Sequence, residues 1–134
     1  HKSIDARQLG EALRGWRGTV LSLQRKPRPE GHAAFEEGLG ARAADLSALN
    51  DDLETMLALL EQVDEYAGVS NTNMHLRAAT GRTARVLVPR PFEWRWLYRG
   101  DESPWFPGFR LYRETAHAGW GETLAALRRD VIGA

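Results

Sequence analysis

The sequence predicts an α/β fold in which helices cover a mostly parallel sheet. Apolar residues alternate along the chain between the spacing of short strands and that of amphipathic helices. The expected strands and helices follow one another in turn, without consecutive hairpins, which is typical of parallel sheets. The length of 134 residues is near that of one domain, so we predict a single domain over residues 1–134.

The first third of the chain predicts two helices and two strands. Leu9 and Leu13 are four residues apart, as on one helix face, and Gly38 or Gly40 ends the second helix. The expected elements are a helix at Ala6–Arg14, a strand at Gly18–Gln24, a helix at Pro29–Gly40 and a short strand at Ala41–Leu46.

The middle of the chain predicts an amphipathic helix that Asn50 or Asp51 caps. Its apolar residues recur three and four apart, so they form one face, at Leu53, Met56, Leu57, Leu60 and Val63. A buried strand is expected at Glu65–Val69, after this helix.

The remaining elements come after Ser70–Asn73, four small polar residues of the kinds that commonly cap helices. Ser70–Asn73 precede a helix that ends at Gly81, and Pro89–Gly108 form a proline-rich loop of a length that is often functional. The expected elements are a helix at Met74–Thr80, strands at Thr83–Val88 and Phe109–Arg113, and a closing helix at Trp120–Val131.

The amino-acid composition disfavours several classes of protein, among them nucleic-acid binders, disulfide-bonded proteins and membrane-spanning proteins. Lys plus Arg and Asp plus Glu number 18 each, so no net positive charge favours nucleic-acid binding. There is no cysteine for disulfides or thiolate metal sites, and no apolar run approaches the ~20 residues of a membrane span. Residues His1 to Gln8 are polar and lack the apolar core of a signal peptide, so we expect a cytoplasmic protein. No metal cluster or cofactor motif is present, so we expect neither metal nor cofactor.

The turn at Ser70–Asn73 is the strongest candidate site. A strand that runs into small polar residues and then a helix places N–H groups and the positive end of the helix dipole at one point, where a phosphate or diphosphate would fit. Plain helix capping explains the same residues. His75, in the first turn, is either a structural histidine or a neutral donor to a phosphate or a sugar hydroxyl.

The stretch from Asp52 to the end resembles the C-terminal part of bacterial heptosyltransferase-like proteins, in the version often attached to tetratricopeptide repeats. The segments that carry the resemblance are Val69–Gly81, Ala84–Pro89, Glu93-Trp-Arg-Trp96, Ser103-Pro-Trp-Phe-Pro107 and Arg110-Leu-Tyr-Arg113. The two tryptophan segments are specific, because neither amphipathicity nor turn chemistry demands those residues.

The resemblance implies one half of a GT-B glycosyltransferase, a Rossmann-like three-layer sandwich that binds a nucleotide-diphosphate sugar. It places the donor diphosphate or sugar at Ser70, Asn71, Thr72, Asn73 and His75, and Gln24 near the nucleotide. The acceptor half and the first strand of this half would lie upstream, because the chain starts at a helix.

The turn departs from the family pattern. Counting back from His75, the family's aspartate falls on Ser70 and its threonine on Asn71. The carboxylate is lost, so donor choice or activity is expected to differ.

The tryptophan segments allow two interpretations. Trp94, Trp96 and Trp105 could stack on a sugar or a base, or pack the loop against the domain or the upstream half. Arg95 could pair with a phosphate or form a surface ion pair.

Two functions follow. In the first, the chain holds the donor for an inverting, metal-independent sugar transfer and is inactive alone, because the catalytic base belongs to the acceptor half. In the second, it is a non-catalytic interaction module that retains the fold. A response-regulator-like domain is disfavoured, because Asp45 and Asp64 do not form an acidic cluster at strand ends. We also expect the apolar tryptophan loop to promote self-association.

Overall fold

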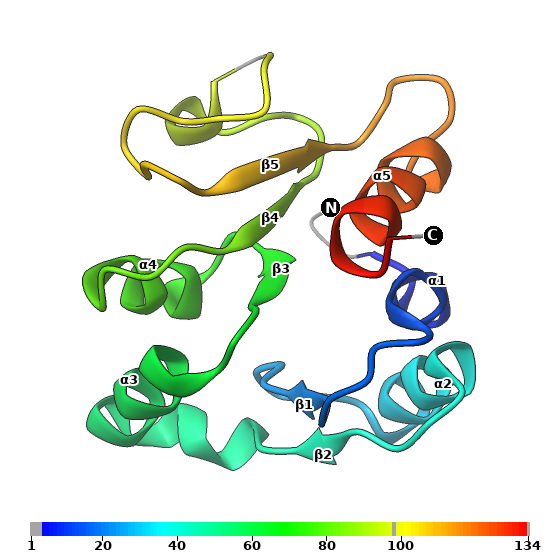
Figure 1. The fold of residues 1–134 in the computed structure, drawn as a ribbon, viewed down its shortest axis with the longest axis vertical. Coiled ribbons are helices and arrows are strands. Elements are labelled where there is room, and N and C mark those ends of the chain that lie inside the picture. Colours follow the sequence, from blue (N-terminus) through cyan, green and yellow to red (C-terminus); the bar gives the residue numbers. More distant parts are fainter. Residues whose placement is uncertain (1–3, 98, 134) are drawn as a thin grey trace. The chain divides into compact units, whose positions relative to one another are not determined.

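The computed structural model describes residues 4–97 and 99–133. The predicted α/β class is confirmed: helices alternate with short strands (Figure 1), and every strand pair is parallel. The strands form two sheets rather than one, β1–β2 and β3–β4–β5. The chain also divides into two compact units. The central unit is Leu53–Thr123, and the N-terminal unit is Ile4–Asp52 together with the residues from Leu124 on.

The N-terminal unit contains two helices, a two-stranded sheet and a 3-10 helix. Its elements are α1 (Ala6–Leu13), β1 (Leu21–Ser22), α2 (Pro29–Leu39), β2 (Ala44–Asp45) and η1 (Ser47–Asp51); α5 (Gly121–Val131) starts in the central unit and continues here. The strand predicted at Gly18–Gln24 is shorter than expected. Only two residues of β1 find partners, Leu21 opposite Ala44 and Ser22 opposite Asp45.

Helices α1 and α2 pack closely because each has a glycine that lies against the main chain of the other helix. A Cβ atom on Gly10 would lie 2.3 Å from the Phe35 carbonyl oxygen, and one on Gly38 would lie 2.1 Å from the Arg7 carbonyl oxygen. Both separations are far below van der Waals contact, so only glycine fits at these two positions. Pro29 starts α2, as predicted, and of the two predicted stops Gly40, at φ 73°, ends it, whereas Gly38 lies inside the helix.

We expect Gly10→Ala to destabilise the protein by about 1–3 kcal/mol, because the added methyl group must push α1 away from α2. Gly31→Ala is the matched control. Gly31 is also helical, but a Cβ atom there meets nothing within 4 Å, so the change should stabilise by up to about 1 kcal/mol. Urea unfolding of both variants checks this, and equal effects would contradict the packing argument.

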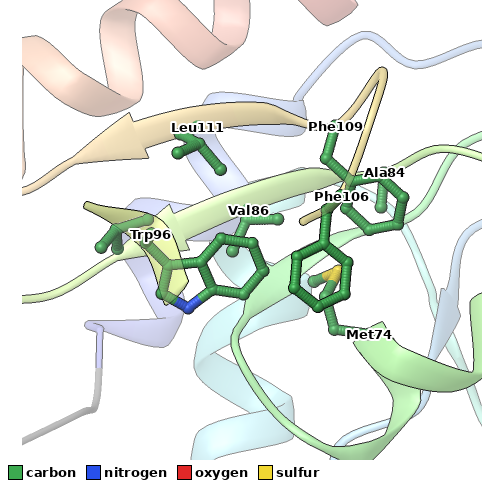
Figure 2. Close-up of a cluster of buried hydrophobic side chains, with 8 residues drawn as sticks. Met74, Ala84, Val86, Trp96, Phe106, Phe109 and Leu111 are labelled. Carbon is green, nitrogen blue, oxygen red and sulfur yellow. The ribbon is translucent and has the colours of Figure 1, made fainter. Parts of the chain in front are cut away.

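The central unit is a three-stranded parallel sheet with β4 in the middle. Its elements are α3 (Leu53–Gln62), β3 (Ala67–Val69), α4 (Thr72–Ala79), β4 (Arg85–Val88), the 3-10 helix η2 (Trp94–Trp96) and β5 (Arg110–Arg113). Figure 2 shows the main buried cluster, in which α4, β4, β5 and the long loop meet. Its members are Met74, Ala84, Val86, Val88, Trp96, Phe106, Phe109 and Leu111.

The start of α3 and the burial of two neighbouring elements differ from the prediction. The helix begins at Leu53, because Asn50 lies inside η1, where its amide donates to the carbonyls of Leu23 at 3.0 Å and Ser47 at 2.9 Å. The predicted apolar face of α3 is only partly covered: Leu53 is 62% and Leu57 37% exposed. Strand β3, expected to be buried, is half-buried.

Arg77 is a buried cation that joins three segments of the central unit. Its side chain is 2% exposed. The guanidinium donates to the carbonyls of Leu60 and Val63 at the end of α3, the latter at 2.9 Å, and to the Thr83 carbonyl at 2.8 Å. Helix carbonyls at a C-terminus carry partial negative charge, so they suit a cation. The same burial lowers the pKa of Arg77.

We expect Arg77→Leu to destabilise the protein by about 2–4 kcal/mol, because it leaves three carbonyls without their charged donor. Arg82→Leu is the control: Arg82 lies near the same turn but is exposed, and surface changes usually stay within about 0.5 kcal/mol. Denaturant unfolding of the two variants measures the difference. A similar small effect of both changes would show that Arg77 does not hold α3 to α4.

Candidate functional site

The turn between β3 and α4 has the structure that its sequence predicts. Asn71 is the N-cap of α4, and its Oδ1 accepts the N–H of Met74 at 3.2 Å. The helix begins at Thr72, two residues before the predicted start. The earlier N–H groups of the first turn have no acceptor within a helix. They therefore form the electropositive end of α4 beside Ser70 and Asn71.

Tyr66, the residue before β3, contacts the side chains of this turn. Its hydroxyl forms hydrogen bonds with Asn71 and Asn73, while the side chain of Asn73 is buried. Burial raises the pKa of Tyr66 to about 12, against the two hydrogen bonds, which lower it. Tyr66 is therefore neutral at physiological pH and adds no negative charge to the turn.

His75 connects α4 to the long loop. The side chain is exposed, and its ring meets the ring of Phe106 edge-on, with centroids 5.3 Å apart and planes at 68°. Phe106 in turn stacks on Trp96, with centroids 4.7 Å apart and planes at 28° (Figure 2). The loop thus packs directly against the first turn of α4, a contact that the sequence does not predict.

Hydrogen bonds to the main chain fix the shape of the long loop. The Ser103 hydroxyl donates to the Arg95 carbonyl at 2.6 Å. The guanidinium of Arg113, on β5, donates to four loop carbonyls: Leu97 at 3.0 Å, Gly100 at 2.9 Å, Arg99 at 3.1 Å, and Trp96. These bonds hold the residues that follow η2 to the edge of the sheet.

The three tryptophans of the loop divide between the two predicted roles. Trp96 is 1% exposed and belongs to the core, so the packing interpretation holds for it. Trp94 and Trp105 are 60% and 53% exposed, and their rings meet edge-to-face with centroids 5.3 Å apart. The guanidinium carbon of Arg95 lies 5.5 Å from the Trp94 ring, and Arg95 pairs with Glu93 at 2.7 Å. An exposed aromatic pair with an adjacent cation therefore stands on a loop that main-chain hydrogen bonds hold in place.

The remaining candidate, Gln24, belongs to the N-terminal unit. It follows β1 at the carboxyl end of that strand, and its side chain is exposed. The other candidates, from Ser70 to Arg95, all lie in the central unit. The structure thus gathers seven of the eight predicted residues into one unit.

A cavity that the sequence does not predict lies in the N-terminal unit. It has a volume of about 900 Å³. The segment that enters β1, the segment that leads into and through β2, and one side of α2 line it, including Trp16, His32 and Glu36. Glu36 accepts the N–H of Ala43 at 2.9 Å, and this bond lowers the pKa of its carboxyl group. Parallel sheets usually bind ligands at the carboxyl ends of their strands. The cavity is at the amino ends, and none of the predicted site residues lines it.

The described residues hold no group of three or more His, Cys, Asp or Glu that could bind a metal ion. Within the same residues, no helix is long and apolar enough to span a membrane.

No protein-family model, curated protein or solved structure matches this chain. The family resemblance therefore rests on the sequence motifs, and the site rests on its geometry.

We expect the unfolding free energy to fall as the pH rises above 10, through the titration of Tyr66. The folded protein keeps the phenol protonated up to about pH 12, whereas the unfolded chain releases the proton near pH 10. Ionisation therefore favours the unfolded state in this window. Tyr66→Phe should flatten the dependence between about pH 10 and pH 12, as measured by urea unfolding. A slope unchanged in that variant would remove Tyr66 as its source.

Proposed function

We propose that the central unit binds a nucleotide-diphosphate sugar with its diphosphate at the start of α4. The observation that carries the proposal is the contact between His75 and Phe106, with ring centroids 5.3 Å apart. It joins the first turn of α4 to the segment that bears Trp105, whose ring meets Trp94. An anion-binding helix start and a pair of exposed aromatic rings suit a ligand that carries both phosphates and rings.

The electrostatics of the turn favour an anion. Ser70, Asn71, Thr72 and Asn73 are uncharged, and the neighbouring phenol of Tyr66 stays protonated. The turn itself therefore carries no carboxylate that would oppose the positive end of the α4 dipole. The side chains of Ser70 and Thr72, together with exposed His75, add hydrogen-bond donors around the same point.

Within this proposal, each candidate has a chemical task. The helix start stabilises the diphosphate leaving group, whose negative charge grows as the bond to the sugar breaks. His75 donates a hydrogen bond to a phosphate or sugar oxygen, and Trp94 stacks on a ring of the donor. Arg95 already pairs with Glu93 at 2.7 Å, so a phosphate would compete with that carboxylate for the guanidinium.

The proposal extends to the architecture. The chain would be the C-terminal, donor-binding half of a GT-B glycosyltransferase of the heptosyltransferase-like kind, and the acceptor half would supply the catalytic base. The parallel pairing of every observed strand supports a Rossmann-like half. On this view the 134 residues bind the donor weakly and catalyse no transfer alone.

Asn71→Asp tests the donor site. Aspartate caps a helix as well as asparagine does, so α4 is preserved, but its charge repels a diphosphate. We expect calorimetric titration with UDP, ADP, GDP and their hexose conjugates to find one that binds. The variant should weaken that binding at least about tenfold, or about 1.4 kcal/mol.

His117→Ala, an exposed change outside the turn, should leave the affinity unchanged. His75→Ala should weaken binding, because it removes a donor without touching the cap. Equal affinities of the wild type and the Asn71→Asp variant would place the ligand elsewhere and reject the proposed site.

The second candidate function is a non-catalytic interaction module. Ser70 and Asn71 stand where the family has an aspartate and a threonine, and the loss of that carboxylate favours a chain that has lost the transfer chemistry. The exposed Trp94 and Trp105 also favour it. The same titration decides between the two. If a longer polypeptide that includes the upstream half binds no nucleotide sugar, the interaction module replaces the donor-binding function.

A further inference from the structure

The cavity of the N-terminal unit has the size of a small-molecule site. Its volume of about 900 Å³ falls within the roughly 300–1,000 Å³ that is typical of ligand pockets. Helix α2, which lines one side of it, lies beside β1 and β2 (Figure 1). Thr19 and Arg42 also line it and are exposed, so solvent reaches the cavity. It is therefore large enough and open enough to take a ligand.

The two carboxylates that line the cavity already have partners within the protein. Glu36 accepts the N–H of Ala43 at 2.9 Å and lies 3.5 Å from Nε2 of His32. Asp45 accepts the N–H of Ser47 at 2.9 Å. A ligand rich in hydrogen-bond donors would have to compete with these contacts. The carboxylates therefore do not favour a cationic ligand.

The donors that line the cavity are less occupied. The guanidinium of Arg42, the hydroxyl of Thr19 and the indole N–H of Trp16 form no hydrogen bond with any residue that the structure describes. A guanidinium forms its strongest hydrogen bonds with carboxylate and phosphate oxygens. The side chains that are available to a ligand thus call for acceptor atoms and negative charge.

Arg14 offsets the negative end of α2 at the same cavity. Leu39 and Gly40, at the C-terminus of this helix, line the cavity, and the helix dipole there would repel an anion. Arg14 donates from Nε to the carbonyl of Gly38 at 2.9 Å and from Nη2 to that of Glu37 at 3.2 Å. The last carbonyls of α2 are therefore bonded to a cation, which reduces their repulsion of an anion.

Trp16 gives the cavity an apolar ring. A Cβ atom on Gly18 would lie 2.9 Å from Nε1 and 3.6 Å from Cδ1 of this indole, so the ring rests against the main chain where only glycine leaves room. The side chain is half-buried and lines the cavity together with Val20 and Leu39. Aromatic faces of this kind pack favourably against the ring of a ligand.

We propose that the cavity of the N-terminal unit binds a small organic anion, whose carboxylate or phosphate group contacts Arg42 and Thr19 and whose ring packs on Trp16. None of the candidate donor-site residues lines this cavity. It also lies at the amino ends of its strands, whereas the donor is proposed at the carboxyl end of β3. The proposal therefore does not rest on the proposed function.

Titration of the 134-residue chain with phenyl phosphate and with benzoate tests the proposal, followed by the NMR shifts of the amides of residues 15–20 and 41–45. We expect saturable shifts with at least one of the two, which also identifies the preferred charged group. Inorganic phosphate and benzyl alcohol each carry one half of the recognised chemistry and should bind at least about tenfold more weakly. No saturable shift in these segments, or shifts only at Ser70–Asn73, would overturn the proposal.

Arg42→Gln tests the charged contact, with Arg17→Gln as its matched control. Arg17 is also exposed and lies beside Trp16 in the chain, but it does not line the cavity. Arg42→Gln should weaken binding of the anion about five- to tenfold, whereas Arg17→Gln should leave it unchanged. Equal losses in the two variants would show unspecific attraction to positive charge and would overturn the proposal.

Thr19→Val and Trp16→Leu test the other two contacts. Thr19→Val removes the hydroxyl at nearly constant volume and should weaken binding about threefold. Trp16→Leu should weaken binding of the ring-bearing anion but not that of inorganic phosphate. Urea unfolding checks that each variant is folded. Unchanged affinity in both Thr19→Val and Arg42→Gln, which alter exposed side chains, would remove the proposed anion contact.

Discussion

The central unit depends on the hydrogen bonding of one buried cation, Arg77. A buried guanidinium is stable only if its N–H groups find acceptors, and here the acceptors are main-chain carbonyls from two different segments. Two of them belong to the end of α3, whose dipole makes them more negative. The cation therefore fixes α3 against α4 and anchors the turn before β4 at the same time. These hydrogen bonds therefore also fix the position of the start of α4, where the candidate site lies.

Local signals in the sequence identify the helices better than the strands. Pro29 and Gly40 bound α2, and Asn71 caps α4, because each acts through its own backbone or side chain. A strand has no such local limit, since its length is set by the partner beside it. The segment Gly18–Gln24 has strand character throughout, yet only Leu21–Ser22 form one, because only two residues of β2 lie opposite. For the same reason, periodicity finds the apolar face of α3 but not which part of it is buried.

The sequence predicts the parts of the candidate site that consecutive residues form. It does not predict the parts that depend on packing between distant segments. The polar turn and its cap follow from consecutive residues, and the structure confirms their geometry. The contact of His75 with Phe106 joins residues 31 positions apart, and no pattern in the sequence signals it. Trp94 and Trp96 differ by two positions in the same motif, yet one is exposed and the other buried. The cavity of the N-terminal unit likewise combines segments that are distant along the chain.

The way in which Arg113 holds the long loop has a consequence for how this protein can vary. All four of its acceptors are main-chain carbonyls, which every amino acid possesses. The path of the loop there is therefore independent of the side chains at Arg99 and Gly100, apart from the positive φ of 91° that favours glycine at the second position. Amino-acid substitutions at exposed positions of the loop can therefore accumulate in evolution without a change in its shape. Arg113 itself cannot be exchanged for lysine on these terms, because an ammonium group lacks the planar fork of donors that reaches four carbonyls at once.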